Sequence, residues 1–202
     1  IYLPIFQPES EFFTVQARET PGLEEIILMS ADGSFADTFP ENAGEPAVET
    51  VIHRVDTDGS VHVAAEGVEF PNAMAIIDGG RTLVVAETWR GKLTAFDLSE
   101  DGKLSNRRTF ADLGPRQPDG ICADAEGAIW TGCFNTGEFL RVKAGGEITD
   151  RIAFDGCGVA CTIGGPSRHT LCCTVYCGPV SDLVAGRRKA AVFTLDVAVG
   201  AA

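Results

Sequence analysis

The sequence predicts an all-β fold of the β-propeller type, because it contains a regular series of strand-like segments. Pairs of alternating apolar runs are separated by glycine-containing turns, which is the pattern of β-hairpins. Three of these turns begin at Asp58, Asp101 and Gly145, so they recur at spacings of 43 and 44 residues. Four short strands in each such period are typical of propeller blades, whereas a β-sandwich lacks this regular order of phrases.

Two kinds of hairpin alternate along the repeat. The first kind is expected at the three turns named above, with strand pairs 50–57 and 60–67, 92–98 and 106–111, and 138–144 and 147–154. The second kind lies between them, with strand pairs 73–77 and 82–88, 121–124 and 128–134, and 159–163 and 170–176. A last strand is expected at 190–197. At one blade per period, residues 46–202 hold roughly three and a half blades, so the propeller is expected to be partial.

Two stretches are expected to depart from the repeat. Residues 1–45 form a separate acidic N-terminal segment in front of the propeller region 46–202. A short helix is expected within it at about 22–29, because a Thr-Pro pair precedes these residues and two glutamates occupy the first turn. The link at 177–189 contains several glycines and a proline, and is expected to be an exposed loop.

Composition and charge argue against several classes of function. The formal net charge of -13 disfavours a nucleic-acid partner or an anionic membrane surface. No apolar run is long enough to cross a bilayer, and no signal peptide is recognised at the start. The seven cysteines contain no Cys-x2-Cys pair, so a structural zinc site is not expected. We expect buried free thiols, with a disulfide as the alternative, and free thiols indicate a reducing compartment such as the cytoplasm.

Two short phrases, 47 residues apart, place an oxygen-bearing side chain directly after a proline. Pro71-Asn72-Ala73 and Pro118-Asp119-Gly120 each lead into the expected inner strand of consecutive blades. Asn72 and Asp119 should therefore lie side by side at one mouth of the central channel. Convergent oxygen ligands suit a hard cation such as calcium. The alternative is that both phrases are ordinary turns, because Asn and Asp side chains often cap their own backbone.

The loops that follow the second strand of each blade are expected at the same mouth. They are 87–90, 134–136 and a third that ends at Tyr176-Cys177. We expect Trp89 and Trp130 to be packing residues. The three histidines belong to hairpins away from this mouth, and no catalytic triad, phosphate loop, dinucleotide fingerprint or Gly-x-Ser-x-Gly elbow is recognised.

The phrases at 70–114, 117–130 and 156–176 resemble the gluconolactonase and senescence-marker-protein (regucalcin) family, and the likeness covers about residues 46–200. The resemblance implies a six-bladed propeller with one divalent cation in its channel. It also implies hydrolysis of lactones or related esters. The family's Asn ligand falls on Asn72, and its Asp ligand, which is also the proposed general base, falls on Asp119. The implied cation is calcium, with zinc, magnesium or manganese as alternatives.

Two departures from the family pattern bear on function. Ala73 replaces the glycine of the usual Pro-Asn-Gly phrase, which would cost about 1 kcal/mol if that position required a positive φ. The Gly-Glu-Gly-Pro phrase that carries the family's Glu ligand is not found in this sequence.

Two hypotheses for the function follow from this reading. The first is a metal-dependent hydrolase that opens a small-molecule sugar lactone or related ester through a cation-activated water, with Asp119 as the catalytic base. The alternative is a truncated, non-catalytic propeller that binds a cation or a partner without turnover. No nucleic-acid or membrane partner is expected in either case, and the oligomeric state is left open.

Overall fold

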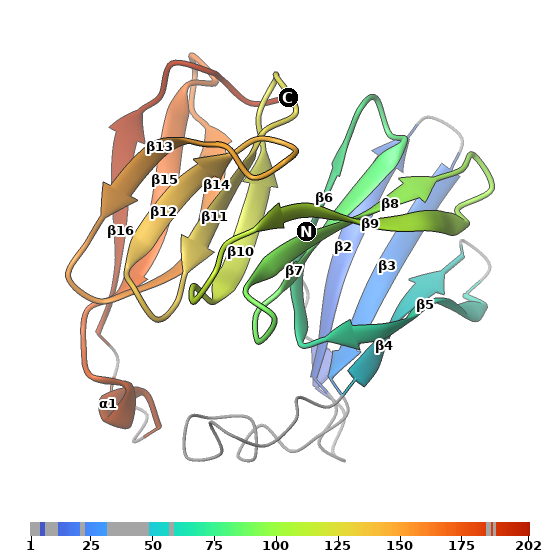
Figure 1. Cartoon of the computed structure of the whole chain (residues 1–202), viewed down its shortest axis with the longest axis horizontal. Helices are drawn as coiled ribbons and strands as arrows, with labels where there is room; N and C mark the ends of the chain where they lie inside the picture. The colour runs from blue at the N-terminus through green and yellow to red at the C-terminus, as the bar shows by residue number, and fades with distance from the viewer. Residues whose placement is uncertain are drawn as a thin grey trace.

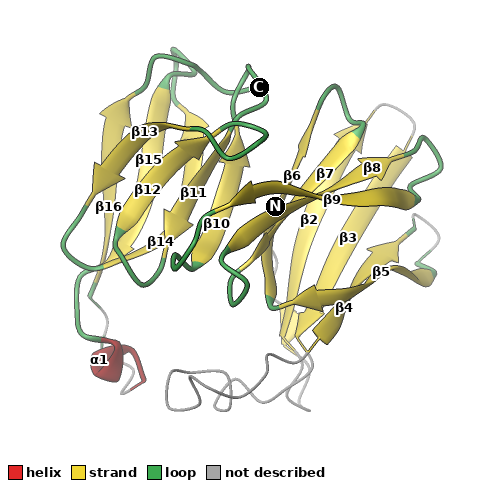
Figure 2. Cartoon of the chain, in the orientation of Figure 1, coloured by secondary structure: helices red, strands yellow, loops and turns green. Residues whose placement is uncertain are grey.

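The computed structural model describes residues 5–6, 12–20, 23–31, 49–56, 59–184, 187 and 189–202. Within these ranges the chain is almost entirely β-structure, in four antiparallel sheets that stand beside one another (Figure 1). Figure 2 shows how little of the described chain is helical. The expectation of an all-β, partial propeller fold is confirmed.

The first sheet has five strands in sequence order, and it is the most N-terminal of the four. Its strands are β1 (Ile5–Phe6), β2 (Phe12–Thr20), β3 (Leu23–Ala31), β4 (Glu49–Val55) and β5 (Val61–Glu69). The helix expected at about 22–29 is wrong, because β3 occupies this segment. Its apolar run Ile26-Ile27-Leu28-Met29 lies between two partners, β2 and β4, and a central strand accommodates such a continuous run as readily as a helix does.

The other three sheets follow the repeat expected from the sequence. The second contains β6 (Pro71–Ile77), β7 (Thr82–Glu87), β8 (Lys92–Leu98) and β9 (Leu104–Asp112). The third contains β10 (Pro118–Ala123), β11 (Ile129–Cys133), β12 (Glu138–Val142) and β13 (Ile148–Ala153). The fourth contains β14 (Cys157–Gly164), β15 (Thr170–Tyr176) and β16 (Ala190–Asp196). Every strand expected between residues 50 and 197 is therefore present, and only the ends differ by a few residues.

Each of these sheets begins with its inner strand, and the inner strands of successive sheets are neighbours. Strand β10 packs against β6 on one side and β14 on the other. The middle strands β7, β11 and β12 are buried along their whole length, because neighbouring sheets cover both of their faces. The outer strand β13 is mostly exposed. This explains why β7 has a nearly continuous apolar sequence, whereas the outer strand β13 mixes apolar and polar residues.

Three apolar clusters lie between successive sheets and hold them together. Between the first and second sheets the cluster includes Ile52, Val68, Met74 and Leu83. Between the second and third it includes Ala75, Val84, Ile121, Ile129 and Leu140. Between the third and fourth it includes Trp130, Phe139, Leu171 and Val175. Burial of large side chains of this kind stabilises the fold by about 1.5–3 kcal/mol each. The packing of blade on blade thus stabilises the arrangement of the sheets.

Two further findings concern the segments outside the repeat. The link at 177–189, expected to be a loop, contains a short helix, α1 (Val180–Val184), so that expectation is partly wrong. Arg187 and Lys189 form ion pairs with Asp182 at 2.9 Å and 2.6 Å, and these contacts fold the link back on itself. The predicted boundary at residue 45 stays a prediction, although β3 and β4 pair across it. No helix in the described ranges is long and apolar enough to span a bilayer.

Candidate functional site

Asn72 and Asp119 occupy equivalent irregularities at the beginning of two inner strands. Pro71 pairs with Glu87 and Met74 with Val85, so Asn72 and Ala73 together oppose a single residue of β7. In the next blade Pro118 pairs with Cys133 and Ile121 with Thr131, which places Asp119 in the same kind of bulge. A β-bulge re-aims the side chain that it carries and is frequent beside functional sites.

The two side chains meet in one pocket. The Asn72 amide donates a hydrogen bond to the Asp119 carboxyl group. Both residues line a cavity of about 320 Å³, whose other wall includes Cys161 of β14 and Cys172 of β15. Three successive sheets thus contribute to the cavity, and the structure brings together the two residues that the sequence singles out.

Burial controls the ionisation of Asp119. Desolvation raises the pKa of its carboxyl group to about 7, and the hydrogen bond from Asn72 opposes this rise only in part. A carboxyl group with a pKa near neutrality can accept or release a proton under physiological conditions. The pocket therefore holds a group that is able to act as a general base.

Close packing between the inner strands β10 and β14 leaves room only for glycine at position 120. A Cβ atom there would lie 2.6 Å from the Cα of Ala160, a distance that real side chains do not adopt. The backbone of Gly120 is not in the left-handed region, and neither is that of Ala73. The conditional strain expected for Ala73 therefore does not arise, because its φ is one that any residue can adopt.

Thr88 joins the beginnings of both inner strands. Its hydroxyl donates a hydrogen bond of 2.7 Å to the carbonyl of Pro118, and its backbone N–H donates one of 3.2 Å to the carbonyl of Phe70. Phe70 and Pro118 lie within two residues of Asn72 and Asp119, respectively. Thr88 is buried, so its hydrogen bonds are shielded from water. Thr88 therefore fixes the two segments that carry Asn72 and Asp119 relative to one another.

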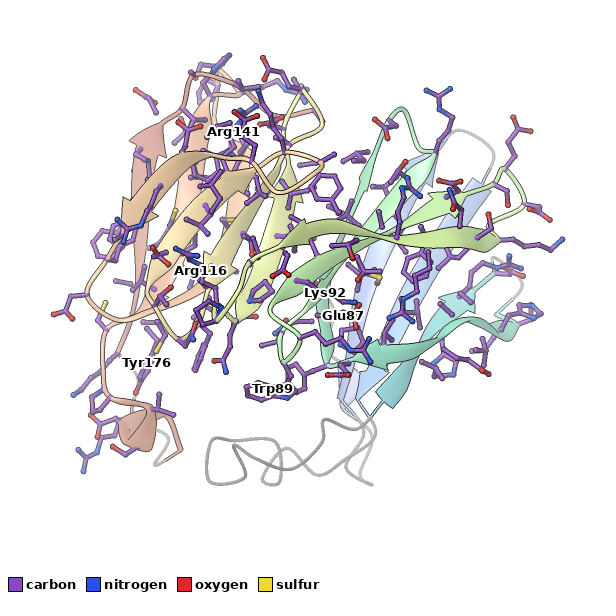
Figure 3. The ribbon with its side chains drawn as sticks, viewed as in Figure 1. Glu87, Trp89, Lys92, Arg116, Arg141 and Tyr176 are labelled. Atoms are coloured by element: carbon purple, nitrogen blue, oxygen red, sulfur yellow. The ribbon has the colours of Figure 1, made fainter. Side chains whose placement is uncertain are left out.

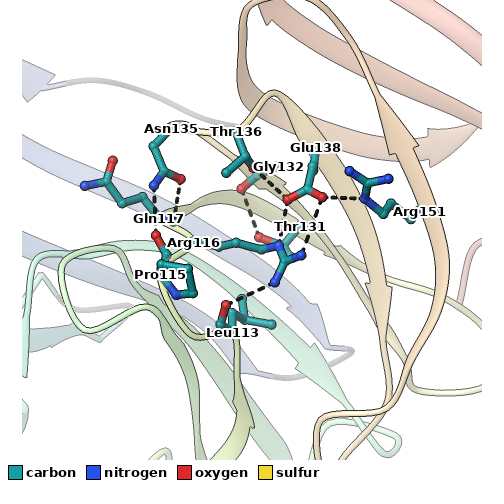
Figure 4. Close-up of polar contacts among 10 residues, drawn as sticks. All are labelled: Leu113, Pro115, Arg116, Gln117, Thr131, Gly132, Asn135, Thr136, Glu138 and Arg151. Carbon is teal, nitrogen blue, oxygen red and sulfur yellow. Dashed lines mark hydrogen bonds and ion pairs between the residues drawn. The ribbon is translucent and has the colours of Figure 1, made fainter.

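Asn135 clamps the segment that leads to Asp119 (Figure 4). Its side-chain carbonyl accepts a hydrogen bond of 3.0 Å from the Gln117 N–H, and its amide donates one of 2.8 Å to the Pro115 carbonyl. The Phe134 N–H donates a further bond of 2.8 Å to the Gln117 carbonyl. The roles of Thr88 and Asn135 did not emerge from the sequence. Their position in the loops after the second strands was the available signal.

Two buried glutamates form ion pairs with lysine and arginine side chains. Glu138 pairs with Arg116 at 2.6 Å and also contacts Arg151 (Figure 4), and the bond from Arg116 is the main reason that its pKa falls to about 2. Glu87 lies beside Lys92 (Figure 3), 3.5 Å away. Although burial opposes it, hydrogen bonds from Thr94 and the Glu69 N–H hold the pKa of Glu87 below its usual value. Both carboxylates organise the loops and are committed to these partners.

The tryptophans and His62, which the sequence analysis considered, make packing or polar contacts outside the pocket. Trp130 is buried in the cluster between the third and fourth sheets, as expected of a packing residue. Trp89 packs against Phe70, with ring centroids 5.3 Å apart, and lies at the same end of the molecule as Tyr176 in Figure 3. His62 contacts Ser60 and Asp56, both at 3.1 Å, through the same ring nitrogen. A proton relay requires both nitrogens, so this group is not a triad.

The donor set of the pocket fits part of a cation site. An amide oxygen and a carboxylate are ligands that calcium prefers, and calcium takes about six to eight oxygens. Across the described ranges, no group of three or more His, Cys, Asp or Glu side chains is arranged to hold a metal ion. Asn72 and Asp119 can thus hold one side of a cation, with water and further groups completing its shell.

The fold is a β-propeller with a pocket beside its inner strands, into which Asn72 and Asp119 converge. Residues 27–176 match the family described as the SMP-30/Gluconolactonase/LRE-like region. The chain therefore belongs to the SMP-30/gluconolactonase family.

Curated relatives span more sequence than this chain does. It is 33% identical over 108 residues to regucalcin of Xenopus laevis, a match that covers 50% of this chain and 36% of that protein. It is 27% identical over 184 residues to pentonolactonase XacC of Haloferax volcanii, with 86% of this chain and 62% of that protein covered. The chain thus covers less than two thirds of either relative.

Solved structures support the same fold. A calcium-binding regucalcin from Agrobacterium tumefaciens superimposes with a TM-score of 0.69 at 20% identity, covering 96% of this chain and 64% of that one. The gluconolactonase XC5397 of Xanthomonas campestris has a TM-score of 0.64 at 23% identity, covering 86% of this chain and 58% of that one. At these identities the similarity shows the fold alone.

Proposed function

We propose that this chain carries the catalytic part of a metal-dependent lactone hydrolase, which acts on a small sugar lactone or a related ester. The observation that carries the proposal is the meeting of Asn72 and Asp119, from adjacent blades, in one pocket. Family membership supports it, as do relatives that are named for lactonase activity. The cation that we propose is calcium, with zinc, magnesium and manganese as the alternatives to test.

The roles of the two residues follow from their chemistry. Asn72 and Asp119 would hold the cation through their side-chain oxygens, and Thr88 and Asn135 would keep those oxygens in register. A bound cation polarises a lactone carbonyl and lowers the pKa of a bound water. Asp119 accepts the proton of the attacking water as the oxygen of that water bonds to the acyl carbon. It then returns the proton to the ring oxygen as the ring C–O bond breaks, which yields a hydroxy acid.

A second candidate function is cation or partner binding without turnover. It is favoured by the small number of strong metal ligands in the pocket, because Asn72 and Asp119 supply the only amide and carboxylate groups among the described residues that line it. In this case the pocket would bind calcium while a lactone supplied to the protein remained intact.

The test measures lactone opening and cation binding on the same preparations. Hydrolysis of a panel of sugar lactones is followed by acid release, with each of the four cations and with EDTA. Asp119→Asn preserves the shape of the side chain and removes the base, so activity should fall at least about 100-fold. Asn72→Ala should weaken cation affinity. The matched control is Asp155→Asn, which removes the same charge from an exposed residue before β14.

Each outcome decides between the candidates. Wild-type activity in Asp119→Asn would refute the role of this residue as the base, and unchanged cation affinity in Asn72→Ala would refute its role as a ligand. Cation binding with no hydrolysis of any lactone would support the non-catalytic alternative.

A further inference from the structure

A pair of thiols bridges the inner strands of two neighbouring blades, close to the pocket. Cys122 lies on β10 and Cys161 on β14, and their Sγ atoms are 3.8 Å apart. The Cys122 S–H donates to the Cys161 sulfur, and the Cys161 S–H in turn points to the carbonyl of Gly120 at 3.8 Å. The two side chains therefore already face one another across the contact between the blades.

We propose that Cys122 and Cys161 form an oxidation site, at which a reversible disulfide cross-links the third and fourth sheets beside the pocket. The sulfurs of a disulfide lie about 2.05 Å apart, so the present gap must close by about 2 Å. Rotation of the two side chains can supply most of this movement, because the strands are already in close contact. The absence of room for a Cβ at Gly120, two residues before Cys122, shows how closely β10 approaches β14 here.

The accessibility of the two thiols determines which of them reacts first. Cys122 is partly exposed, whereas Cys161 is 7% exposed and forms part of the packed cluster between the sheets. Hydrogen peroxide therefore reaches Cys122 first. Cys122 gives up its proton, its thiolate attacks one peroxide oxygen and the O–O bond breaks. The departing hydroxide takes up that proton, so a sulfenic acid and water form.

The second step uses Cys161 as the resolving thiol. Its sulfur attacks the Cys122 sulfur, the S–O bond breaks, and the departing hydroxide takes the Cys161 proton as water. Overall, two thiols and one hydrogen peroxide give one disulfide and two waters. A dithiol reductant reverses the reaction by thiol–disulfide exchange.

Other cysteines are less suited to this reaction. Cys173 lies directly opposite Cys161 in the β14–β15 ladder, but it is fully buried, so neither member of that pair is open to the oxidant. Cys172 pairs with Thr162 in the same ladder. Cys177 is exposed and lies beyond the end of β15, where it can react with a second molecule. These differences single out Cys122 and Cys161.

Oxidation would also act on the wall of the pocket. Cys161 lines the cavity that contains Asp119, and its S–H contacts the carbonyl of the residue that follows Asp119. Disulfide formation removes that donor and draws the Cys161 side chain toward β10. The proposal itself does not depend on hydrolysis, because it concerns the covalent state of the two thiols.

The test maps the bond directly. The whole chain, with Cys177→Ser to prevent links between molecules, is treated with hydrogen peroxide, quenched by alkylation and digested without reduction. We expect a cross-linked peptide that joins Cys122 to Cys161, a mass lower by two hydrogens and two fewer alkylated thiols. Dithiothreitol should restore both thiols.

Variants then separate this pair from its neighbours. Cys122→Ser and Cys161→Ser should each abolish the cross-link, whereas Cys173→Ser should retain it. A link between Cys161 and Cys173, a cross-link that survives in Cys122→Ser, or sulfenic and sulfonic acids on Cys122 without any cross-link would overturn the proposal. The digest of the protein with Cys122 and Cys161 intact decides the question even if a variant fails to fold.

Discussion

Asp119 carries its carboxyl group into a pocket where its direct side-chain partner is an amide. The hydrogen bond from Asn72 does not compensate for the loss of water around a negative charge, so the pKa stays near 7. A divalent cation in the same place would favour the ionised form. Cation binding and proton release at this residue are therefore linked.

The first prediction concerns the pH dependence of calcium binding. Below pH 7 calcium must displace the Asp119 proton, so the affinity should rise as much as about tenfold per pH unit toward 7 and level off above it. Calorimetric titrations from well below to well above this value would measure the effect. Asp119→Asn should show a weak and pH-independent affinity. Constant affinity in the unaltered protein would contradict the assignment.

The second prediction concerns the stability of the cation-free protein. The pKa of Asp119 is about 7 in the folded state against 3.8 for the free side chain, so the folded state holds the proton more tightly. Stability should therefore fall as the pH rises between these two values, by up to about 1.4 kcal/mol per unit of pKa shift. Denaturant unfolding in EDTA checks this, and Asp119→Asn should show a smaller decline. If the stability of Asp119→Asn fell equally with pH, the effect would come from other titratable groups.

The third prediction tests the contact between inner strands. Gly120→Ala forces a Cβ to within 2.6 Å of the Ala160 backbone, and should cost about 1–3 kcal/mol of unfolding free energy. Gly164→Ala is the matched control, because nothing lies within 4 Å of a Cβ at that position of β14. Equal stability of the two variants in urea unfolding would show that the strands can separate without cost.

At the scale of the elements, the site depends on loops that hold the beginnings of strands. Thr88 comes from the loop between β7 and β8, yet it bonds the first residue of β10 in the next blade. Asn135 comes from the loop between β11 and β12 and bonds the segment before β10. The position of Asp119 is thus determined by contacts from two blades.

The fourth prediction separates the Thr88 hydroxyl from its shape. Thr88→Val keeps the volume but removes the donor to the buried Pro118 carbonyl, which should cost about 1–3 kcal/mol and weaken calcium binding. Thr88→Ser retains the hydroxyl and should bind calcium nearly as the unaltered protein does. Thermal melts and calcium titrations of both variants provide the measurements. Equal calcium affinity in Val and Ser variants would show that the hydroxyl does not position the site.

At the scale of the whole molecule, the pocket lies where neighbouring sheets meet. Asn72 belongs to the second sheet and Asp119 to the third, so a ligand that binds both residues ties two blades together. The apolar clusters between the sheets perform the same task without a ligand. Cation binding should therefore add to the cohesion of the stacked blades.

The fifth prediction follows from this geometry. Calcium at a hundredfold excess over its dissociation constant should increase the free energy of unfolding by about 2.7 kcal/mol. The melting temperature should rise accordingly, and EDTA should reverse the change. Asn72→Ala should lose most of this gain. Differential scanning calorimetry with and without calcium measures the effect. A melting temperature that does not respond to calcium would contradict a cation site between the blades.

The sequence by itself determined the repeat, the strands of the last three sheets and the pairing of Asn72 with Asp119 at equivalent positions. These features depend on local patterns, namely alternation, glycine turns and the order of phrases within each period. Such patterns can be recognised in the sequence because each blade consists of hairpins that follow one another along the chain.

Tertiary structure alone decided the rest, because it depends on segments that are distant in the sequence. The partners β2 and β4 make residues 23–31 a strand where local signals favoured a helix. Contacts from three sheets form the pocket, raise the pKa of Asp119 and bring Cys122 to Cys161. Burial and contact of this kind are properties of the assembled blades, and no single period of the sequence contains them.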